Sequence, residues 1–144
     1  MRLFIDANIL IDVIDASRPH SHSSAALFAW LIEHPNQYEL FTSCDLLTTV
    51  YYLTRKHLNP QEALHKIKIL NRTLTLVEFG NVEVDEAISL MERYPQYTDM
   101  EDTIQYVIAR KKQCEYILTN DQGFASDAIP LLSSDLALET LTQV

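Results

Sequence analysis

Residues 2–14, RLFIDANILIDVI, decide the fold. Arg2 to Ile5 is a short apolar run that is typical of a buried strand, and Asp6 follows it directly. Apolar side chains then recur at helical spacing at Ile9, Leu10, Val13 and Ile14. The stretch therefore predicts a strand and a helix with a carboxylate at the point where they meet.

The same alternation of strands and helices continues along the chain. Further strands are expected at 39–42, 73–79, 115–119 and 129–132, and helices at 23–33, 59–72, 82–93 and 135–141, with two more that start near Thr42 or Ser43 and at Thr98. Strands that alternate with helices form parallel sheets covered on both faces. We expect an α/β fold, a three-layer sandwich with a mostly parallel sheet of about five strands flanked by helices. Because no repeat or linker interrupts it, residues 1–144 are expected to form a single domain.

Composition narrows the class of protein. The chain has 144 residues, of which 47% are hydrophobic and 22% charged, and these values exclude disorder for most of it. Neither a membrane span nor a secretory signal is readable, and the two cysteines form no CxxC pair, so we expect a cytoplasmic protein with free thiols. A net charge of -9 argues against a broad basic surface for nucleic acid. It still allows a nuclease whose positive charge comes from bound metal ions.

Four aspartates stand where a parallel sheet collects ligands. Asp6 follows the first expected strand, Asp121 follows the fourth, and Asp99 and Asp102 begin a helix. Ligands of open α/β sheets bind beyond the carboxyl ends of the strands. Carboxylates crowded there repel one another, and a hard divalent cation relieves that repulsion. The pattern predicts a Mg²⁺ or Mn²⁺ site.

Each of these residues also has a structural interpretation. An Asp at a strand end can cap the next turn or helix, and Asn8 can adjust the turn or cap the first helix. Thr98 and Glu101 have the spacing of a capping box, which assigns Glu101 to the helix terminus and makes Asp102 the better site candidate.

Other catalytic classes are poorly supported. The sequence contains no glycine-rich phosphate loop, no GxSxG motif and no second pair of ligands to complete a zinc site with His20 and His22. A phosphatase of the haloacid dehalogenase type requires a second Asp where Asn8 stands. The sequence therefore favours a metal site formed by the four aspartates.

Four stretches, FIDANILIDVI, SCDLLTTVYYLTRK, DMEDTIQYVIARKKQCEYILTNDQGF and IPLLSSDLAL, resemble the PIN-domain family and, within it, the VapC-like toxin nucleases. The resemblance spans nearly the whole chain in order and spacing. It implies a ribonuclease that depends on Mg²⁺ or Mn²⁺, acts as the toxin of a toxin–antitoxin pair, forms a homodimer and is inhibited by a small antitoxin. It assigns catalysis and metal binding to Asp6, Asp102 and Asp121, with Asp99 as a further metal ligand.

One position departs from the family. PIN nucleases usually carry a Glu on the central helix about six residues after the Ser, here Ser43, and this sequence has Thr49 there. Asp45 lies one turn earlier, where it could form a capping box with Thr42. The departure is either a trait of a subgroup or the mark of a catalytically degenerate domain that binds protein or RNA.

The remaining candidates are auxiliary. We expect Asn8, Ser43, Thr49 and Asn120 to support the site. Arg55 and Lys56 begin a locally basic segment that runs to Arg72, and we expect them to contact RNA phosphates, although a solvated helix face is the other interpretation.

Overall fold

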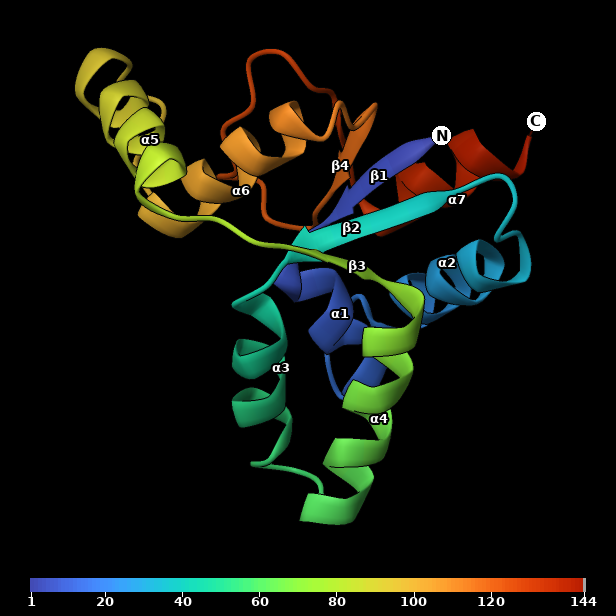
Figure 1. Cartoon of the computed structure of the whole chain (residues 1–144). Helices are drawn as coiled ribbons and strands as arrows, with labels where there is room; N and C mark the ends of the chain where they lie inside the picture. Colours follow the sequence, from blue (N-terminus) through green and yellow to red (C-terminus); the bar gives the residue numbers. More distant parts are fainter. Residues whose placement is uncertain (144) are drawn as a thin grey trace.

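The computed structural model describes residues 1–143 and shows five parallel strands flanked by helices (Figure 1). In chain order the elements are β1 (Arg2–Ile5), α1 (Ala7–Ile14), α2 (Ser21–Glu33), β2 (Glu39–Ser43), α3 (Leu46–Thr54), α4 (Pro60–Thr73), β3 (Thr75–Val77), α5 (Asn81–Arg93), α6 (Met100–Lys111), β4 (Tyr116–Leu118), β5 (Leu131–Leu132) and α7 (Ser134–Thr142). The α/β class expected from the sequence is confirmed.

The strand order explains where a ligand would bind. The sheet runs β3-β2-β1-β4-β5, and every neighbouring pair is parallel. The chain winds outward from β1 to β3 and then returns to β4 on the other side of β1. The strand order therefore reverses between β1 and β4, and the crevice beyond their carboxyl ends is the expected ligand site.

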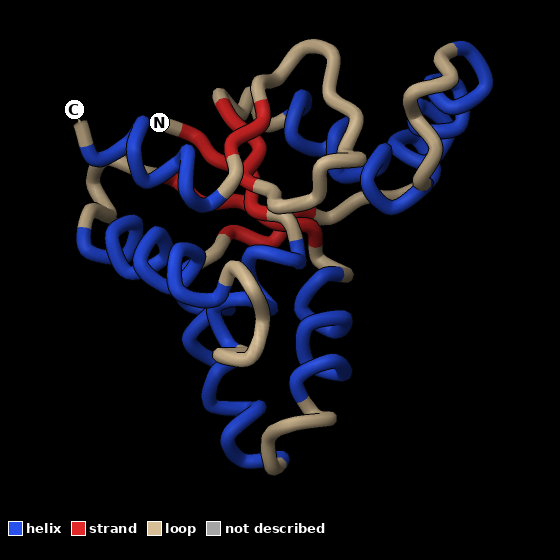
Figure 2. The backbone as a smooth tube through the Cα atoms, turned by 180° about the vertical axis from the view of Figure 1, so that it is seen from behind, coloured by secondary structure: helices blue, strands red, loops and turns tan. Residues whose placement is uncertain are grey.

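Two hydrophobic cores lie on the two faces of the sheet. Leu3 and Ile5 point into the core formed with α1, α2, α3, α4 and α7, whereas Phe4 points into the core formed with α6. This alternation follows from the two-residue period of a strand. Figure 2 shows the strands lying between the two groups of helices. The three layers predicted from the sequence are confirmed.

Element boundaries differ from the sequence expectation in physically informative ways. The strand expected at 73–79 is restricted to β3 because α4 continues to Thr73. The helix after β2 is capped by neither Thr42 nor Ser43, and the capping box between Thr42 and Asp45 is wrong. Thr42 is buried in β2, where its hydroxyl donates to the Ile5 carbonyl at 2.9 Å, and the Ser43 hydroxyl donates to Asp45.

Two further expectations from the sequence concern membrane-spanning helices and the cysteine thiols. In residues 1–143, no helix has the length and apolar character needed to cross a membrane. Cys44 and Cys114 are free thiols, as expected, and burial raises the pKa of Cys114 to about 11.

Candidate active site

Asp6 is held at the carboxyl end of the central strand. Its side chain is 4% exposed, and its backbone N–H donates to the Leu118 carbonyl of β4 at 3.0 Å. One carboxylate oxygen accepts from the Ala7 N–H at 2.6 Å, so Asp6 is the N-cap of α1. Burial raises the pKa of Asp6, against the lowering effect of its hydrogen bonds with Thr119 and Ala7, and the charge of Asp121 raises it further. Asp6 therefore caps α1, and its burial disfavours the ionised form of its carboxyl group.

Thr119 and Asn8 tie Asp6 to the loop after β4. The Thr119 hydroxyl donates to Asp6 at 2.9 Å and accepts from the Asp121 N–H at 3.0 Å. Asn8 Nδ2 donates to Asp6 at 2.9 Å, and its Oδ1 accepts from the Asn120 N–H at 3.1 Å. The expectation that Asn8 caps α1 is therefore wrong, because Asp6 occupies the cap and Asn8 bridges two loops. Thr119 is a site residue that sequence reasoning missed.

Asn120 anchors the loop that carries Asp121. Its Nδ2 donates to Asp12 at 2.9 Å, and its Oδ1 accepts from the Ser134 N–H of α7 at 2.9 Å. Asp12 is a second residue that was not predicted; it is 2% exposed and pairs with Arg18 at 2.5 Å. The sequence does indicate Asp12, because an acidic residue among the apolar residues of α1 is unusual. The network connects α1 and α7 to the residue before Asp121.

Asp102 carries the most perturbed carboxyl group of the site. It lies in the first turn of α6, and its pKa is raised to about 7 by partial burial, by the charges of Asp6, Asp99 and Asp121, and by a close contact with the Asp121 side chain. The charges of the other three predicted aspartates all act on Asp102, so the four residues belong to one acidic region of the fold, although within residues 1–143 no three of them are arranged to hold a metal ion together. Like charges at such a site are relieved by a proton or by a cation.

The start of α6 differs from the expected capping box. Asp99, not Thr98, is the N-cap, and its side chain accepts from the Asp102 N–H at 2.9 Å. Asp caps a helix at least as well as Thr, so the helix begins one residue later than expected. Glu101 is thus not the reciprocal arm of a cap. Its pKa is raised by partial burial and then by the charges of Asp45, Asp6 and Asp99, so it lies within electrostatic reach of the predicted aspartates.

Because Asp99 is the N-cap of α6, its side chain is expected to contribute to the stability of the fold. Asp99→Ala is expected to lower the free energy of unfolding by about 1 kcal/mol, because it leaves the N-terminal N–H groups of α6 without a side-chain acceptor. Asp99→Asn keeps the acceptor and serves as the matched control, and Thr98→Ala and Glu101→Gln are expected to cause no loss. Urea denaturation at neutral pH measures all four. A loss in Thr98→Ala equal to that in Asp99→Ala would restore the original capping box.

The central helix contributes Asp45 at its start. Asp45 precedes Leu46, the first residue of α3, and after partial burial its charge is the next largest cause that raises the pKa of Glu101. Thr49 lies one turn along α3, half-buried, and its hydroxyl donates at 3.5 Å to the Asp45 carbonyl. Ser43 is buried at the end of β2. The structure thus places an acidic residue one turn before the position where the family usually has Glu.

Arg55 and Lys56 lie apart from the carboxylates. Both are exposed at the far end of α3, whose nine residues span about 14 Å. Their expected role as RNA contacts outside the site stays a prediction.

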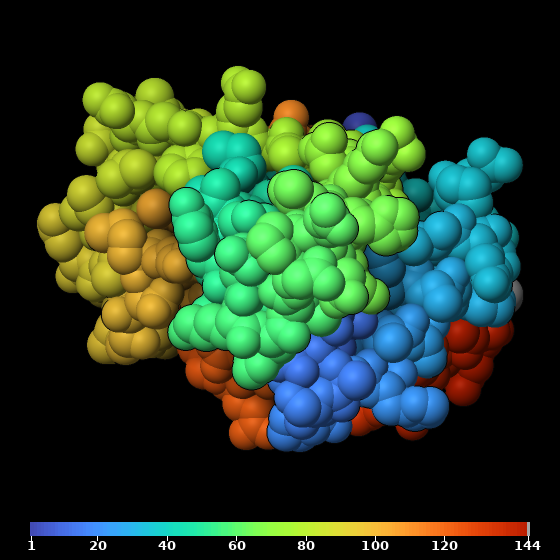
Figure 3. Space-filling view, turned by 90° about the horizontal axis from the view of Figure 1, so that it is seen from below, coloured from blue at the N-terminus to red at the C-terminus, as the bar shows by residue number. Residues whose placement is uncertain are grey.

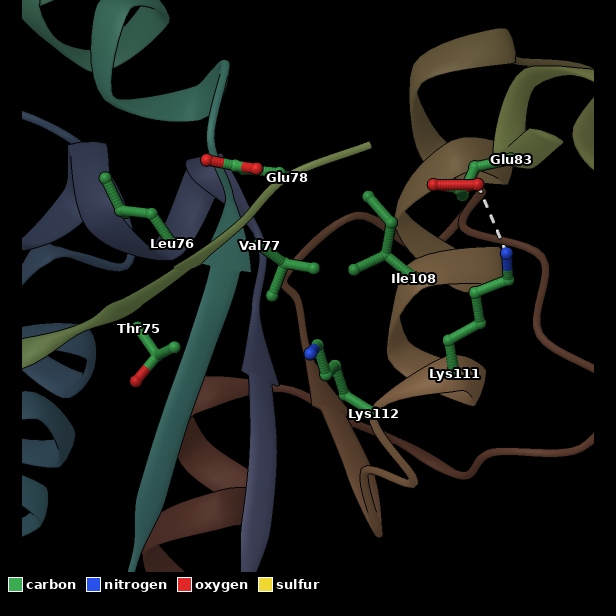
Figure 4. Close-up of a pocket in the computed structure, with 8 residues that line it drawn as sticks. All are labelled: Thr75, Leu76, Val77, Glu78, Glu83, Ile108, Lys111 and Lys112. Atoms are coloured by element: carbon green, nitrogen blue, oxygen red, sulfur yellow. Dashed lines mark hydrogen bonds and ion pairs between the residues drawn. The ribbon is translucent and has the colours of Figure 1, made fainter. Parts of the chain in front are cut away.

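Two hollows have different relations to the carboxylates. One of about 340 Å³ opens beside Asp121 and is lined also by His20, Gln122 and Ser133. Another of about 390 Å³ lies between β3 and the carboxyl-terminal half of α6 (Figure 4), where Lys111 pairs with Glu83 at 3.1 Å. Lys111 lies about 14 Å along α6 from Asp102. Only the first hollow adjoins the predicted site.

The donor set fits a hydrated divalent cation by its chemistry. Within residues 1–143, no three His, Cys, Asp or Glu side chains are arranged so that together they could hold a metal ion. Mg²⁺ usually keeps several of its waters and is held by one or two carboxylates, so a group of three ligands is not required. The pKa values of Asp6 and Asp102 are raised first by burial and then by neighbouring carboxylates, and a cation would favour the ionised form of both. The residues predicted from the sequence to hold it are Asp6, Asp102, Asp121 and Asp99.

Comparison with known proteins identifies the family. Residues 2–123 match the PIN domain family. The chain is 40% identical over 135 residues to Ribonuclease VapC1 of Aquifex aeolicus, covering 93% of this chain and 91% of that protein.

Solved structures agree in fold. VapC20 of Mycobacterium tuberculosis, described as a toxin that cleaves the sarcin–ricin loop, superposes with a TM-score of 0.70 at 16% identity, over 85% of this chain and 92% of that one. VapBC of Salmonella typhimurium, solved bound to DNA, gives 0.68 at 15% identity, over 93% and 98%. Together with the ordered carboxylates at the ends of β1 and β4, these matches show that the chain belongs to the PIN-domain family.

Proposed function

We propose that this protein is a ribonuclease that hydrolyses RNA phosphodiester bonds with Mg²⁺ or Mn²⁺ and acts as the toxin of a toxin–antitoxin pair. The observation that carries the proposal is the placement of Asp6 and Asp121 after the adjacent parallel strands β1 and β4 of a PIN-domain fold, and burial together with three neighbouring carboxylates raises the pKa of Asp102 to about 7. The ribonuclease name of the 40% identical relative supports the same activity.

The proposed division of labour follows from the contacts. When bound, a divalent cation would polarise the phosphate and lower the pKa of a bound water. Asp6, Asp102 and Asp121 would hold it, with Asp99 as a further ligand. Asn8 and Thr119 orient Asp6, and Asn120 orients the loop of Asp121. Because Asp102 is partly protonated near neutral pH, cation binding is expected to release a proton.

Thr49 in place of the usual Glu raises the alternative of a binding module without catalysis. Binding of protein or RNA alone does not require buried, mutually repelling carboxylates, which lower the stability of the fold. Partial burial and then the charges of Asp45, Asp6 and Asp99 raise the pKa of Glu101, so Asp45 and Glu101 add acidic groups to this region beyond the predicted aspartates. This observation favours the nuclease, and Ser43 and Thr49 remain proposed auxiliary residues.

Protein partners are proposed from the exposed apolar surface. Tyr52, Leu53 and Leu64 are 70%, 38% and 57% exposed on α3 and α4, the two helices that face the viewer in Figure 3. Exposed apolar patches commonly mark protein contacts. We propose that a small antitoxin and a second copy of the chain are the protein partners, that RNA reaches the site past Arg55 and Lys56, and that the protein acts in the cytoplasm.

Cleavage of RNA tests the proposed function. Purified protein is expected to cut a labelled single-stranded RNA only with Mg²⁺ or Mn²⁺ present, and a chelator is expected to stop it. Asp121→Asn is expected to reduce the rate at least about 100-fold, since even the loss of a hydrogen-bond partner of a metal ligand costs about 10–100-fold. Asp127→Asn, an aspartate bonded to Gln96 at 3.2 Å, is the control and should cleave normally. Equal cleavage with and without chelator would refute the proposal.

A further inference from the structure

A buried amide without partners lies next to the carboxylates. Gln105 is 1% exposed, and within residues 1–143 neither its Nε2 nor its Oε1 has a hydrogen-bond partner. Buried side-chain amides are nearly always hydrogen-bonded, because an unpaired polar group away from water destabilises the fold. Its neighbours on α6, Tyr106, Val107 and Ile108, are buried apolar residues. The fold alone therefore does not explain an amide at this position.

The side chain of Gln105 lies next to Asp6. Its interaction with the Asp6 carboxyl group is the smallest of the effects that lower the pKa of that group, and neither amide atom reaches hydrogen-bonding geometry with it. On α6 it follows Asp102 by three residues and Glu101 by four, so it shares the helix face that looks into the site. Gln105 is thus an unpaired polar group directed at the acidic cluster.

We propose that Gln105 is a positioning residue for a hydrated divalent cation. With a cation bound, its Nε2 would donate to the Asp6 carboxylate and its Oε1 would accept from a water that the cation holds, so both unpaired atoms would gain partners. An amide suits this place because it offers a donor and an acceptor and adds no charge to the cluster. Hydrogen-bond partners of this kind fix the orientation of metal ligands. The inference rests on the metal site proposed above.

Opposite effects on stability and on metal affinity test the proposal. Gln105→Met preserves the length of the side chain and removes both unpaired polar atoms. The metal-free variant is expected to unfold at the same temperature as the wild type or a higher one, whereas its Mn²⁺ affinity, measured by calorimetry, is expected to fall about 10-fold or more. An amide with a purely structural role predicts the reverse, a lower unfolding temperature with unchanged affinity, and that result would overturn the proposal.

A matched control and a spectroscopic readout complete the test. Thr54→Val deletes a buried hydroxyl that is bonded at 3.0 Å to the Tyr51 carbonyl at the far end of α3, and it should leave Mn²⁺ affinity unchanged. In ¹⁵N-labelled wild type, the side-chain amide resonances of Gln105 are expected to shift on saturation with diamagnetic Mg²⁺. Resonances that stay in place would contradict the proposal.

Asp102→Asn, measured in parallel, separates the two hypotheses. Failure of the wild type to bind Mn²⁺ would remove the proposed metal site and this inference with it. Binding by the wild type that is lost in Asp102→Asn but undiminished in Gln105→Met would leave the metal site standing and refute the role of Gln105.

Discussion

Replacing Asp102 with Asn is expected to reduce RNA cleavage at least about 100-fold and, in the metal-free protein at pH 8, to raise the unfolding temperature. Both effects have one cause. The carboxylate lies among Asp6, Asp99 and Asp121, whose charges together with burial raise its pKa to about 7. At pH 8 the folded protein must keep it ionised against that repulsion. Asn removes the charge, and with it the ligand that a cation needs.

The size of the stability effect can be estimated. Partial exposure of Asp102 screens the repulsion, so we expect a gain of about 1 kcal/mol, which moves the unfolding temperature by roughly 3 °C for a chain of this size. Cleavage assays and thermal unfolding with a chelator present measure the two effects, and Asp127→Asn is again the control. A variant that cleaves at the wild-type rate would remove Asp102 from the site.

The metal-free protein is expected to lose stability as the pH rises from about 4 to about 8. The Asp102 carboxyl group titrates near 3.8 when unfolded and near 7 when folded, so the folded state binds more protons across this window. Stability falls with pH wherever the folded state binds more protons. The raised pKa values of Asp6 and Glu101 act in the same direction.

This pH dependence also has a control and a contradicting outcome. We expect a loss of about 1 kcal/mol between pH 5 and pH 8 after allowing for solvent screening, measured by urea denaturation with a chelator. Asp102→Asn should flatten the profile, and saturating Mg²⁺ should flatten it in the wild type because the cation favours the ionised carboxylates. Stability that rises from pH 5 to pH 8 in the metal-free protein would show that the carboxylates are not crowded.

Sequence patterns predicted the architecture because burial dictates them. Consecutive residues around Leu3 and Ile117 are apolar, so both faces of these strands are buried. Continuous apolar runs of this kind are typical of parallel strands covered by helices on both faces. Ile5 pairs with Leu118 where β1 and β4 end, so Asp6 and Asp121 follow two adjacent strand ends. This part of the candidate site follows from topology.

The sequence did not reveal the features of the site that depend on competition between two possible N-cap residues or on tertiary contacts. Thr98 and Asp99 are both good caps, and choosing the wrong one assigned Glu101 to the helix terminus instead of the site. The role of Gln105 has no signal along the chain, since its place within the α6 core and its orientation toward Asp6 appear only after folding.

Titration of the metal-free protein with Mn²⁺ in a calorimeter tests the central claim most directly. The wild type and Asp127→Asn are expected to bind the ion with equal affinity, and Asp102→Asn is expected to lose binding. If the wild type binds no Mn²⁺ at millimolar concentration, or if Asp102→Asn binds as the wild type does, the carboxylates of β1, β4 and α6 do not form a metal-dependent nuclease site.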